Sequence, residues 1–453
     1  MNSLQSPSQP SKILPSPPPS RWKYFQTTSN LESAVLNSDQ ESTINDFNPH
    51  KAPDTTKKPL DNFFYPAEVA GFLDRIDLPK KQRDECLGQS WEYARAVIPT
   101  YTNWKRYVAF MKIIIIGIVA EYRGDLFDIA TEPNNALGHN FHALIEELFG
   151  GTVGQRQMLL EYRCYLLTTQ EKSSLRKHNS EFFRRYVNSI AQSPKAWFRM
   201  RDTDALARFT IYAALVCNDI DDFYFTEPQW DILTEIGDVM YDSVAFYKHR
   251  SEGETHSTYA YTPVEIRTEA FGMYREILFA LDHVWTERHE KYHQATTNFL
   301  RQFGGAIHIT MRRYRFVEEG LTLGKREDEV VVDQTRQNFK LWTRFDAKEL
   351  AAAKLSHEAN LARYKNIMSL SDELMIPGMA EYIEAGGEGL CNKCLYRESY
   401  GAKAAHQFGG VKLCEDCTSV FKDYIESFPI RAAEVFPELL SVPGYTKEVR
   451  TLA

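Results

Sequence analysis

The chain has 453 residues, of which 43% are apolar and 25% are charged, so it is long enough to bury one large hydrophobic core or two modest ones. Its formal net charge of -8 comes from scattered acidic residues, and no run of lysines and arginines marks a surface for a phosphate backbone. The composition indicates a globular protein and argues against nucleic acid as a partner.

The first 58 residues are rich in Ser, Pro, Asn and Asp, and they lack the periodic apolar positions that a packed element needs. We expect residues 1–58 to form a disordered N-terminal tail. This stretch shows no basic and apolar signal-peptide pattern, so we expect a cytoplasmic protein.

From residue 59 to 386, apolar residues recur at the spacing of one helix face, which predicts a helical domain. Its most apolar run, residues 108–120, contains a lysine and is shorter than the roughly 20 residues that a bilayer span requires. We expect a buried core helix there and no membrane span. Glu121, Asp125 and Asp128 follow this run at the spacing of one helix face.

The stretch NDIDDFYFTE, residues 218–227, places Asp219, Asp221 and Asp222 just after an apolar helix. Negative charge at the C-terminal end of a helix is unfavourable unless a cation compensates for it. One interpretation is a solvated loop that begins after an earlier helix end. The other is a cation site.

Thr226 and Gln229 form a capping-box pattern, which predicts that a new helix begins here. Four acids recur on that helix at steps of four, three and four residues: Asp231, Glu235, Asp238 and Asp242. A solvated acidic face is one interpretation of this stripe. The alternative is that the stripe faces the preceding aspartates and binds Mg²⁺, which prefers carboxylate oxygens.

Basic side chains lie on both sides of these acids, and guanidinium and ammonium groups suit phosphate oxygens. The basic residues are Arg199, Arg201, Arg208, Lys248, His249, Arg250, Arg312, Arg313 and Arg315, and Tyr314 lies between the last two arginines. Acids that bind metal, combined with such cations, predict a diphosphate ligand. The order of acidic and basic segments parallels class I terpene synthases, although neither of their consensus metal motifs is present. Two registers for the metal ligands therefore stay open.

Near residue 386 the sequence becomes glycine-rich, and Cys391-x2-Cys394 is followed after nineteen residues by Cys414-x2-Cys417. This spacing predicts a tetrahedral four-cysteine zinc site in a module spanning residues 387–424, followed by a C-terminal helix and tail at 425–453. Four thiolates leave zinc no open position, so the expected role is structural. A ribbon that binds nucleic acid is the alternative, and the acidic composition argues against it.

Long segments of the chain closely resemble the fungal α-ionylideneethane synthases, which are sesquiterpene synthases of the abscisic acid pathway. They include WEYARAVIPTYTNWKRYVAFMKIIIIGIVAEYRGD, CNDIDDFYFTE, GGAIHITMRRYRFVEEGLTLGK and CNKCLYRESYGAKAAHQFGGVKLCEDC, and the resemblance runs from about residue 64 to 437. It implies an all-α, terpene-synthase-like bundle whose catalytic domain is residues 59–386, with the small C-terminal zinc module.

The resemblance further implies farnesyl diphosphate as substrate, and α-ionylideneethane as product by way of β-farnesene and allofarnesene. It also implies Mg²⁺ as the catalytic ion, Zn²⁺ as a structural ion, and cytochrome P450 enzymes as downstream pathway partners. Another terpene cyclase or a farnesene-forming diphosphate lyase is the alternative within this chemistry. A scaffold protein without catalysis is the alternative from another class.

We assign hypothetical roles on this basis. For Mg²⁺ the ligands are Asp219, Asp222, Asp238 and Asp242, with Glu121 and Asp125 as the rival or complementary set. For the diphosphate they are Arg199, Arg201, Lys248, Arg250 and Arg313. The expected catalytic side chains are Glu235, His249, Glu252 and Tyr314, with proton transfer the task of Glu235, His249 or an acid of the Glu252 and Glu254 pair.

Overall fold

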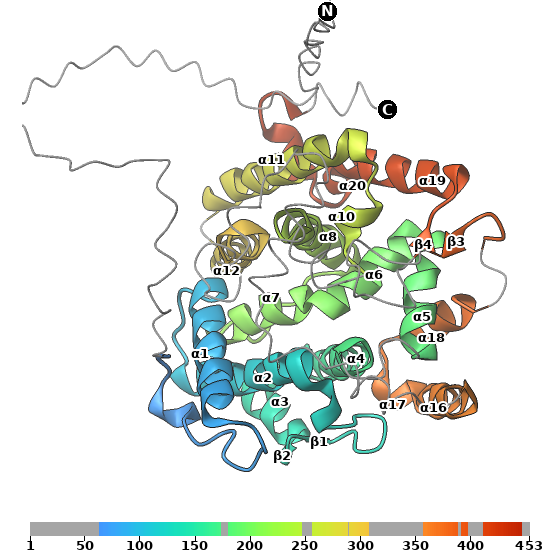
Figure 1. Ribbon diagram of the computed structural model, residues 1–453. Helices are drawn as coiled ribbons and strands as arrows, with labels where there is room; N and C mark the ends of the chain where they lie inside the picture. Colours follow the sequence, from blue (N-terminus) through green and yellow to red (C-terminus); the bar gives the residue numbers. More distant parts are fainter. Residues whose placement is uncertain are drawn as a thin grey trace, which may run out of the picture.

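A computed structural model describes residues 63–173, 180–246, 256–288, 290–307, 357–387, 391–396 and 411–445. Within these ranges almost all regular structure is helical (Figure 1). The predicted all-α fold with a small C-terminal four-cysteine cluster is confirmed. The tail predicted for residues 1–58 lies outside the described residues, and the predicted domain boundaries stay predictions.

The N-terminal half contains η1 (Ala67–Val69), α1 (Lys80–Val97), α2 (Trp104–Arg123), η2 (Gly124–Leu126), α3 (Phe141–Phe149), α4 (Gln155–Ser173), α5 (Glu181–Asn188), η3 (Ser189–Ala191), α6 (Pro194–Ala205) and α7 (Ala207–Val216). The C-terminal half contains α8 (Glu227–Val244), α10 (Thr258–Tyr261), η4 (Val264–Ile266), α11 (Arg267–Thr286), α12 (Lys291–Arg301), the π-helical turn η5 (Gln302–Ala306), α16 (His357–Ser369), α17 (Ser371–Leu374), α18 (Met379–Ala385), α19 (Glu415–Glu426), α20 (Phe428–Val435) and η8 (Pro437–Ser441). Two antiparallel pairs complete the list: β1 (Asn135–Ala136) with β2 (His139–Asn140), and β3 (Leu395–Tyr396) with β4 (Val411–Lys412).

The central element is α8, which Figure 1 shows end-on near the middle of the molecule. It packs against α6, α7, α10, α11, α12, α20 and η5. Gly304 of η5 allows an especially close approach, because a Cβ there would lie 2.7 Å from the terminal methyl of Met240 in α8. Twelve of the 18 residues of α8 are buried, and three of these are the carboxylic acids Glu235, Asp238 and Asp242. The predicted helix start is confirmed, since Gln229 accepts a hydrogen bond from the Thr226 backbone N–H at 3.0 Å.

The apolar run at residues 108–120 lies in the buried helix α2, as predicted. Its single charge, Lys112, reaches Glu147 at 3.9 Å. No helix in the described part of the chain combines the length and the apolar character that crossing a membrane demands.

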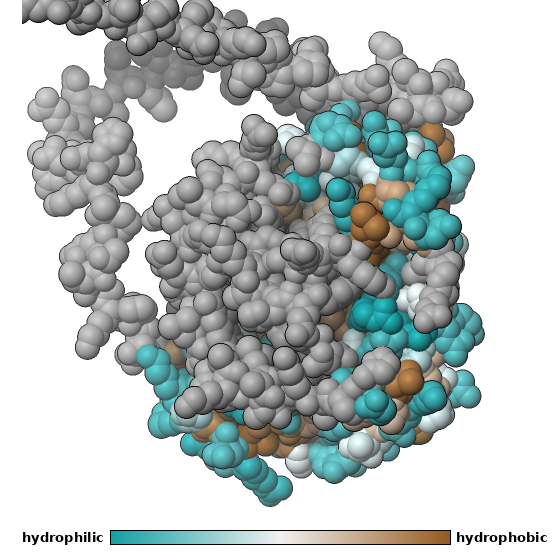
Figure 2. All heavy atoms as spheres, turned by 45° about the vertical axis from the view of Figure 1, so that its right-hand side comes forward, coloured by the Kyte–Doolittle hydropathy of each residue, from teal (hydrophilic) through white to brown (hydrophobic). Residues whose placement is uncertain are grey.

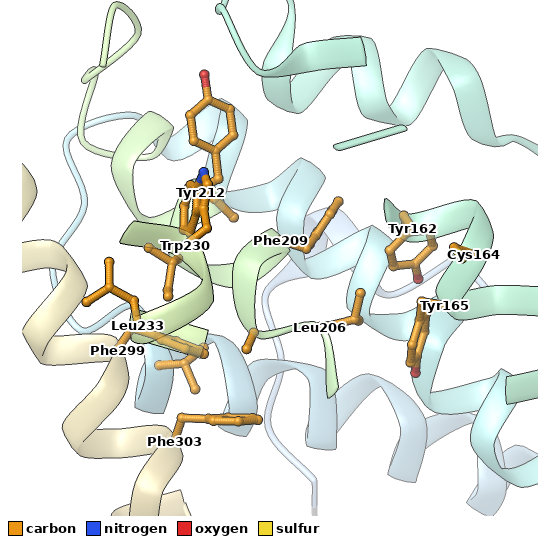
Figure 3. Packing of buried hydrophobic residues seen from close by; sticks show 14 of the residues in the cluster. Tyr162, Cys164, Tyr165, Leu206, Phe209, Tyr212, Trp230, Leu233, Phe299 and Phe303 are labelled. Carbon is orange, nitrogen blue, oxygen red and sulfur yellow. The ribbon is translucent and has the colours of Figure 1, made fainter. Parts of the chain in front are cut away.

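Aromatic residues fill much of the interior between the helices. Figure 3 shows Tyr162 and Tyr165 of α4 near Phe209 of α7, and the ring centroids of Tyr162 and Phe209 are 5.1 Å apart. On the face presented in Figure 2, the coloured surface is mostly hydrophilic and apolar residues occur in small groups. The apolar content of the described chain is therefore concentrated in the helix packing.

Candidate active site

A chain of paired charges runs from the end of α2 to the end of α8. We call it the polar network, and it consists of Asp128, Glu171, Lys172, Arg201, Asp204, Asp242, His256 and Arg363. These residues come from α4, α6, α8, α16, the segment after η2, and the segment before α10. Residues far apart in the sequence therefore meet in one place.

The first half of the polar network is built on the last turn of α4. Arg363 donates to Asp128 at 2.7 and 2.9 Å, and its Nη2 also donates to Glu171 at 2.8 Å. The next residue along α4, Lys172, places Nζ 2.6 Å from Asp204 Oδ1. The end of α4 thus joins the acids that follow α2 to the acids of α6.

Arg201 carries the polar network from α6 to α8. Its Nη1 donates to Asp204 at 2.9 Å, while its Nη2 and Nε donate to Asp242 at 2.6 and 3.0 Å. His256 Nε2 lies 3.2 Å from Asp204 Oδ2, and the Thr258 backbone N–H donates to Asp242 at 2.5 Å. Burial opposes ionisation of Asp204, but Lys172, His256 and Arg201 outweigh it and lower the pKa of this carboxyl to about 2. The charge of Asp204 is therefore balanced by Lys172, His256 and Arg201, while Asp242 is hydrogen-bonded to Arg201 and Thr258.

Asp238, one turn before Asp242 on α8, is different. Its side chain is 0% exposed, and neither carboxyl oxygen has a hydrogen-bond partner among the described residues. Burial raises the pKa of Asp238 well above its usual range; Arg201 opposes the shift, and the carboxylates of Asp202 and Asp242 add to it. Buried polar groups are almost always paired, so this acid is the clearest candidate for a ligand-binding group in the described structure.

The aspartates of NDIDDFYFTE lie elsewhere. Helix α7 ends at Val216, and Asp219 has a left-handed backbone with φ of 57°. Asp219 accepts hydrogen bonds from Thr102 at 2.6 Å and Asn103 at 2.9 Å, at the beginning of α2. Asp222 is exposed. The helix thus ends before these acids, which begin a loop.

The two acid sets predicted to share a metal site are not brought together. Asn103 and Glu121 stand at opposite ends of α2, and a rise of 1.5 Å per residue separates them by about 27 Å. Asp219 belongs to the first end. Asp238 and Asp242 lie in the second half of α8, whereas Asp219 and Asp222 precede its first turn.

The rival acids lie at the second end of α2, next to the start of the polar network. Asp125 receives two hydrogen bonds from Arg123, at 3.0 and 2.9 Å, and Glu121 lies 3.5 Å from the Tyr165 hydroxyl. Asp128 follows Asp125 by three residues and belongs to the network itself. The Glu121 and Asp125 set is therefore close in sequence to Asp128, at the end of the polar network opposite to Asp242.

The predicted phosphate-binding arginines of α6 separate as well. Arg199 contacts Glu161 and Asp202, on a face of α6 away from Arg201. Glu161 precedes Lys172 by eleven residues, which is about 16 Å along α4. Arg208 pairs with Asp202 and Glu227 near the beginning of α8. Of these arginines only Arg201 belongs to the polar network.

Glu235, predicted to move protons, is already bound by four donors. Arg431 donates to its two oxygens at 2.7 and 2.8 Å, Tyr274 donates at 2.6 Å and Tyr424 at 3.1 Å. Nine further candidate residues lie outside the described ranges: Lys248, His249, Arg250, Glu252, Glu254, Arg312, Arg313, Tyr314 and Arg315.

Five members of the polar network were not expected from the sequence: Glu171, Lys172, Asp204, His256 and Arg363. Asp204 follows Arg201 by three residues, and this helical spacing is a usable signal for an ion pair. Lys172 and His256 belong to no stripe or motif, and only the tertiary fold brings them to Asp204.

The four cysteines form a candidate metal centre of their own. Cys391, Cys394, Cys414 and Cys417 place their sulfurs within 4.8 Å of one another, and they form the only such group among the described residues. The Cys391 and Cys414 sulfurs are 3.7 Å apart. Zn–S bonds of about 2.3 Å in a tetrahedron require about 3.8 Å, so the cluster fits a structural metal such as zinc. The Lys393 backbone N–H helps to lower the pKa of Cys391 to about 7, which favours the thiolate.

Comparison with known proteins agrees with the resemblance. Residues 61–438 match the family described as "Alpha-ionylideneethane synthase aba3". A relative of that name from Botryotinia fuckeliana (strain B05.10) is 52% identical over 430 residues, covering 92% of this chain and 96% of the relative. "Alpha-ionylideneethane synthase abl3" from Leptosphaeria maculans is 51% identical over 415 residues, covering 91% and 94%. The chain described here belongs to the α-ionylideneethane synthase family.

Proposed function

We propose that this enzyme converts farnesyl diphosphate to α-ionylideneethane with loss of diphosphate. The proposal is supported by family membership across almost the whole chain. The structural observation that carries it is Asp238, a buried carboxyl that has no hydrogen-bond partner in the described part of the chain and that feels the charge of Arg201. A binding site for a metal and a diphosphate requires an acid with free lone pairs next to a cation.

We propose Asp238 and Asp242 as Mg²⁺ ligands, with Glu121 and Asp125 as the complementary set at the other end of the polar network. Mg²⁺ bound there would neutralise negative charge that develops on the departing diphosphate. Asp238 supplies two oxygens without hydrogen-bond partners among the described residues. Asp242, one turn away on the same helix, would have to give up a hydrogen bond from Arg201 or Thr258 to bind the ion. A role for Asp219 and Asp222 stays a prediction with less geometric support, since they contact the opposite end of α2.

Arg201 is the described cation best suited to hold the diphosphate. Its guanidinium bridges two acids and lies in the electrostatic field of Asp238. Lys172 adds a second positive charge 2.6 Å from Asp204. A fork of N–H groups matches phosphate oxygens, and an ammonium acts as a point charge.

The proposed route needs a proton to leave one intermediate and to return to another. We propose His256 for this task, because an imidazole can accept and release a proton near neutral pH. Its Nε2 lies 3.2 Å from Asp204 and 3.5 Å from Lys172 Nζ. Glu235 is a weaker choice because four donors hold its oxygens. The aromatic interior around Tyr162 and Phe209 would exclude water from carbocations (Figure 3).

Incubation of the purified protein with farnesyl diphosphate and Mg²⁺, followed by gas chromatography with mass spectrometry, tests the proposal. We expect α-ionylideneethane as the end product, and we expect a chelator to abolish its release. A farnesene as the only product would establish the lyase alternative. Absence of any hydrocarbon would leave the scaffold alternative.

A further inference from the structure

The four-cysteine cluster is connected to α8 by a short series of contacts. Cys414 caps the N-terminus of α19, since its sulfur accepts from the Cys417 backbone N–H at 3.5 Å. Cys417 lies in the first turn of the same helix, and its sulfur is 3.8 Å from the Ala191 carbonyl oxygen of η3. A metal bound by these two cysteines therefore fixes the first turn of α19 within the four-cysteine cluster, next to η3.

The remainder of α19 packs on α6 and then reaches α8. The rings of Phe421 and Tyr424 stack on Phe198, with centroids 6.1 and 5.6 Å away. The Tyr424 hydroxyl then donates to Glu235 of α8 at 3.1 Å. Figure 1 shows α19 leading from the β3–β4 hairpin toward α20 beside α8 and α6.

Arg431 of α20 completes the connection. Its guanidinium carbon lies 3.8 Å from the centroid of the Tyr424 ring, and its two Nη atoms donate to the two oxygens of Glu235 at 2.8 and 2.7 Å. Tyr274 of α11 holds the same carboxylate at 2.6 Å. Glu235 is 1% exposed, so this pair is shielded from solvent and geometrically specific.

Glu235 and Asp238 are three residues apart on α8, and side chains at that spacing lie on one face of a helix. A rotation or slide of α8 at Glu235 therefore displaces Asp238. We infer that the four-cysteine cluster positions Asp238 through α19, Arg431 and Glu235, so that Arg431 and Glu235 act as positioning residues for the proposed metal site. This inference rests on the proposed function only in placing Asp238 in that site.

Hydrogen exchange of the full chain tests the connection without relying on activity. Removing zinc with a chelator should increase exchange in peptides from α19 and also in those from α8, while peptides from α3 stay protected. In Arg431→Gln, peptides from α8 should exchange faster even with zinc bound, and zinc removal should cause little further increase in their exchange. If zinc removal increased exchange in α19 but left exchange in α8 unchanged, the inference would be overturned.

The Mg²⁺ dependence of turnover supplies the second readout. We expect Arg431→Gln to raise the Mg²⁺ concentration for half-maximal turnover at least threefold, and Arg431→Lys to fall between it and the parent. Arg301→Gln is the matched control, because it breaks an ion pair with Asp282 between α12 and α11. If this Mg²⁺ concentration rose equally in Arg431→Gln and Arg301→Gln, Arg431 would contribute only to the general stability of the protein.

Asp238→Asn separates the two proposals. If this substitution leaves the Mg²⁺ dependence unchanged, the metal assignment fails whatever Arg431 does. If it alters the dependence and Arg431→Gln does not, the metal assignment stands and the positioning inference fails.

Discussion

At the scale of single residues, Asp238 is the position where stability conflicts with the metal-binding role that we propose. A buried carboxyl without hydrogen bonds costs free energy, and helix α8 would be more stable with an apolar or neutral side chain there. Asp242, one turn later, avoids this cost through Arg201 and Thr258. Costly groups persist at sites where a ligand completes them.

Replacing Asp238 by asparagine should therefore separate the two properties. We expect turnover to fall by about 100-fold or more, because the proposed metal loses a charged ligand. The urea midpoint should stay equal or rise, since an ionisable group leaves the interior. Asp222→Asn, at an exposed loop residue, tests the rival ligand set, and we expect a smaller loss of turnover than in Asp238→Asn. If turnover fell in Asp222→Asn and stayed unchanged in Asp238→Asn, the metal site would be assigned to the stretch NDIDDFYFTE instead.

His293 gives a prediction for pH. Its ring is 6% exposed and stacks on Trp285 with centroids 4.1 Å apart, and burial lowers its pKa to about 4, against the pull of Glu290. The unfolded chain binds a proton near pH 6.5 and the folded chain only near pH 4, so stability is full above pH 6.5 and falls as the pH drops through this window. The shift corresponds to at most about 3 kcal/mol.

Urea unfolding at pH 7.5 and pH 5 measures this loss. His293→Gln should reduce the difference between the two midpoints. His283→Gln should leave it unchanged, because the His283 side chain is 60% exposed and its nearest carboxylate, on Glu287, is 3.9 Å away. A pH difference that survives in His293→Gln would assign the acid sensitivity to another group.

At the scale of elements, features that depend on residues close in sequence were predictable, whereas contacts between distant elements were not. The buried helix at residues 108–120, the helix start at Thr226 and the four-cysteine cluster each depend on residues close in sequence. The bond between Arg201 and Asp242 spans 41 positions, and no periodicity specifies it. The position of Asp219 likewise depends on tertiary contacts, because it is held by Thr102 and Asn103 at the beginning of α2.

Close packing of α4 against α7 leads to an element-scale prediction. A Cβ at Gly154 would lie 2.6 Å from Tyr212 and 2.9 Å from Tyr224, so Gly154→Ala should destabilise the protein by about 1–3 kcal/mol. Gly272, inside α11, has no heavy atom within 4 Å of the corresponding position. Gly272→Ala should therefore stabilise by roughly 0.5–1 kcal/mol. Thermal unfolding of the two variants should show shifts of opposite sign, and a shared sign would contradict this packing.

At the scale of the whole molecule, the C-terminal part of the described chain returns to the centre. Helices α19 and α20 follow the cysteine cluster and end against α6, α8 and α11. The cluster is thus part of the main structure rather than a detached appendage. Its cysteine spacing was readable from the sequence, whereas its contact with Glu235 required the fold.

Metal analysis tests whether the four-cysteine cluster binds zinc and stabilises the whole molecule. We expect one zinc per chain by atomic emission spectroscopy, and we expect Cys394→Ser to lose most of it. The variant should unfold at a lower temperature, because metal binding to the folded state contributes directly to stability. Cys86→Ser, at a buried cysteine outside the cluster, should retain the zinc. Full zinc content in Cys394→Ser would remove this residue from the ligand set.

The polar network also bears on how the protein matures. Arg363 pairs with Asp128 and Glu171, and Lys172 pairs with Asp204, only after α4, α6 and α16 have docked, so no early segment of the nascent chain can assemble these charges alone. Contacts between residues so distant in sequence form late, since loop closure precedes them. If the polar network is the proposed site, a polypeptide still emerging from the ribosome would be unable to ionise an allylic diphosphate, and reactive cations would arise only in the finished fold.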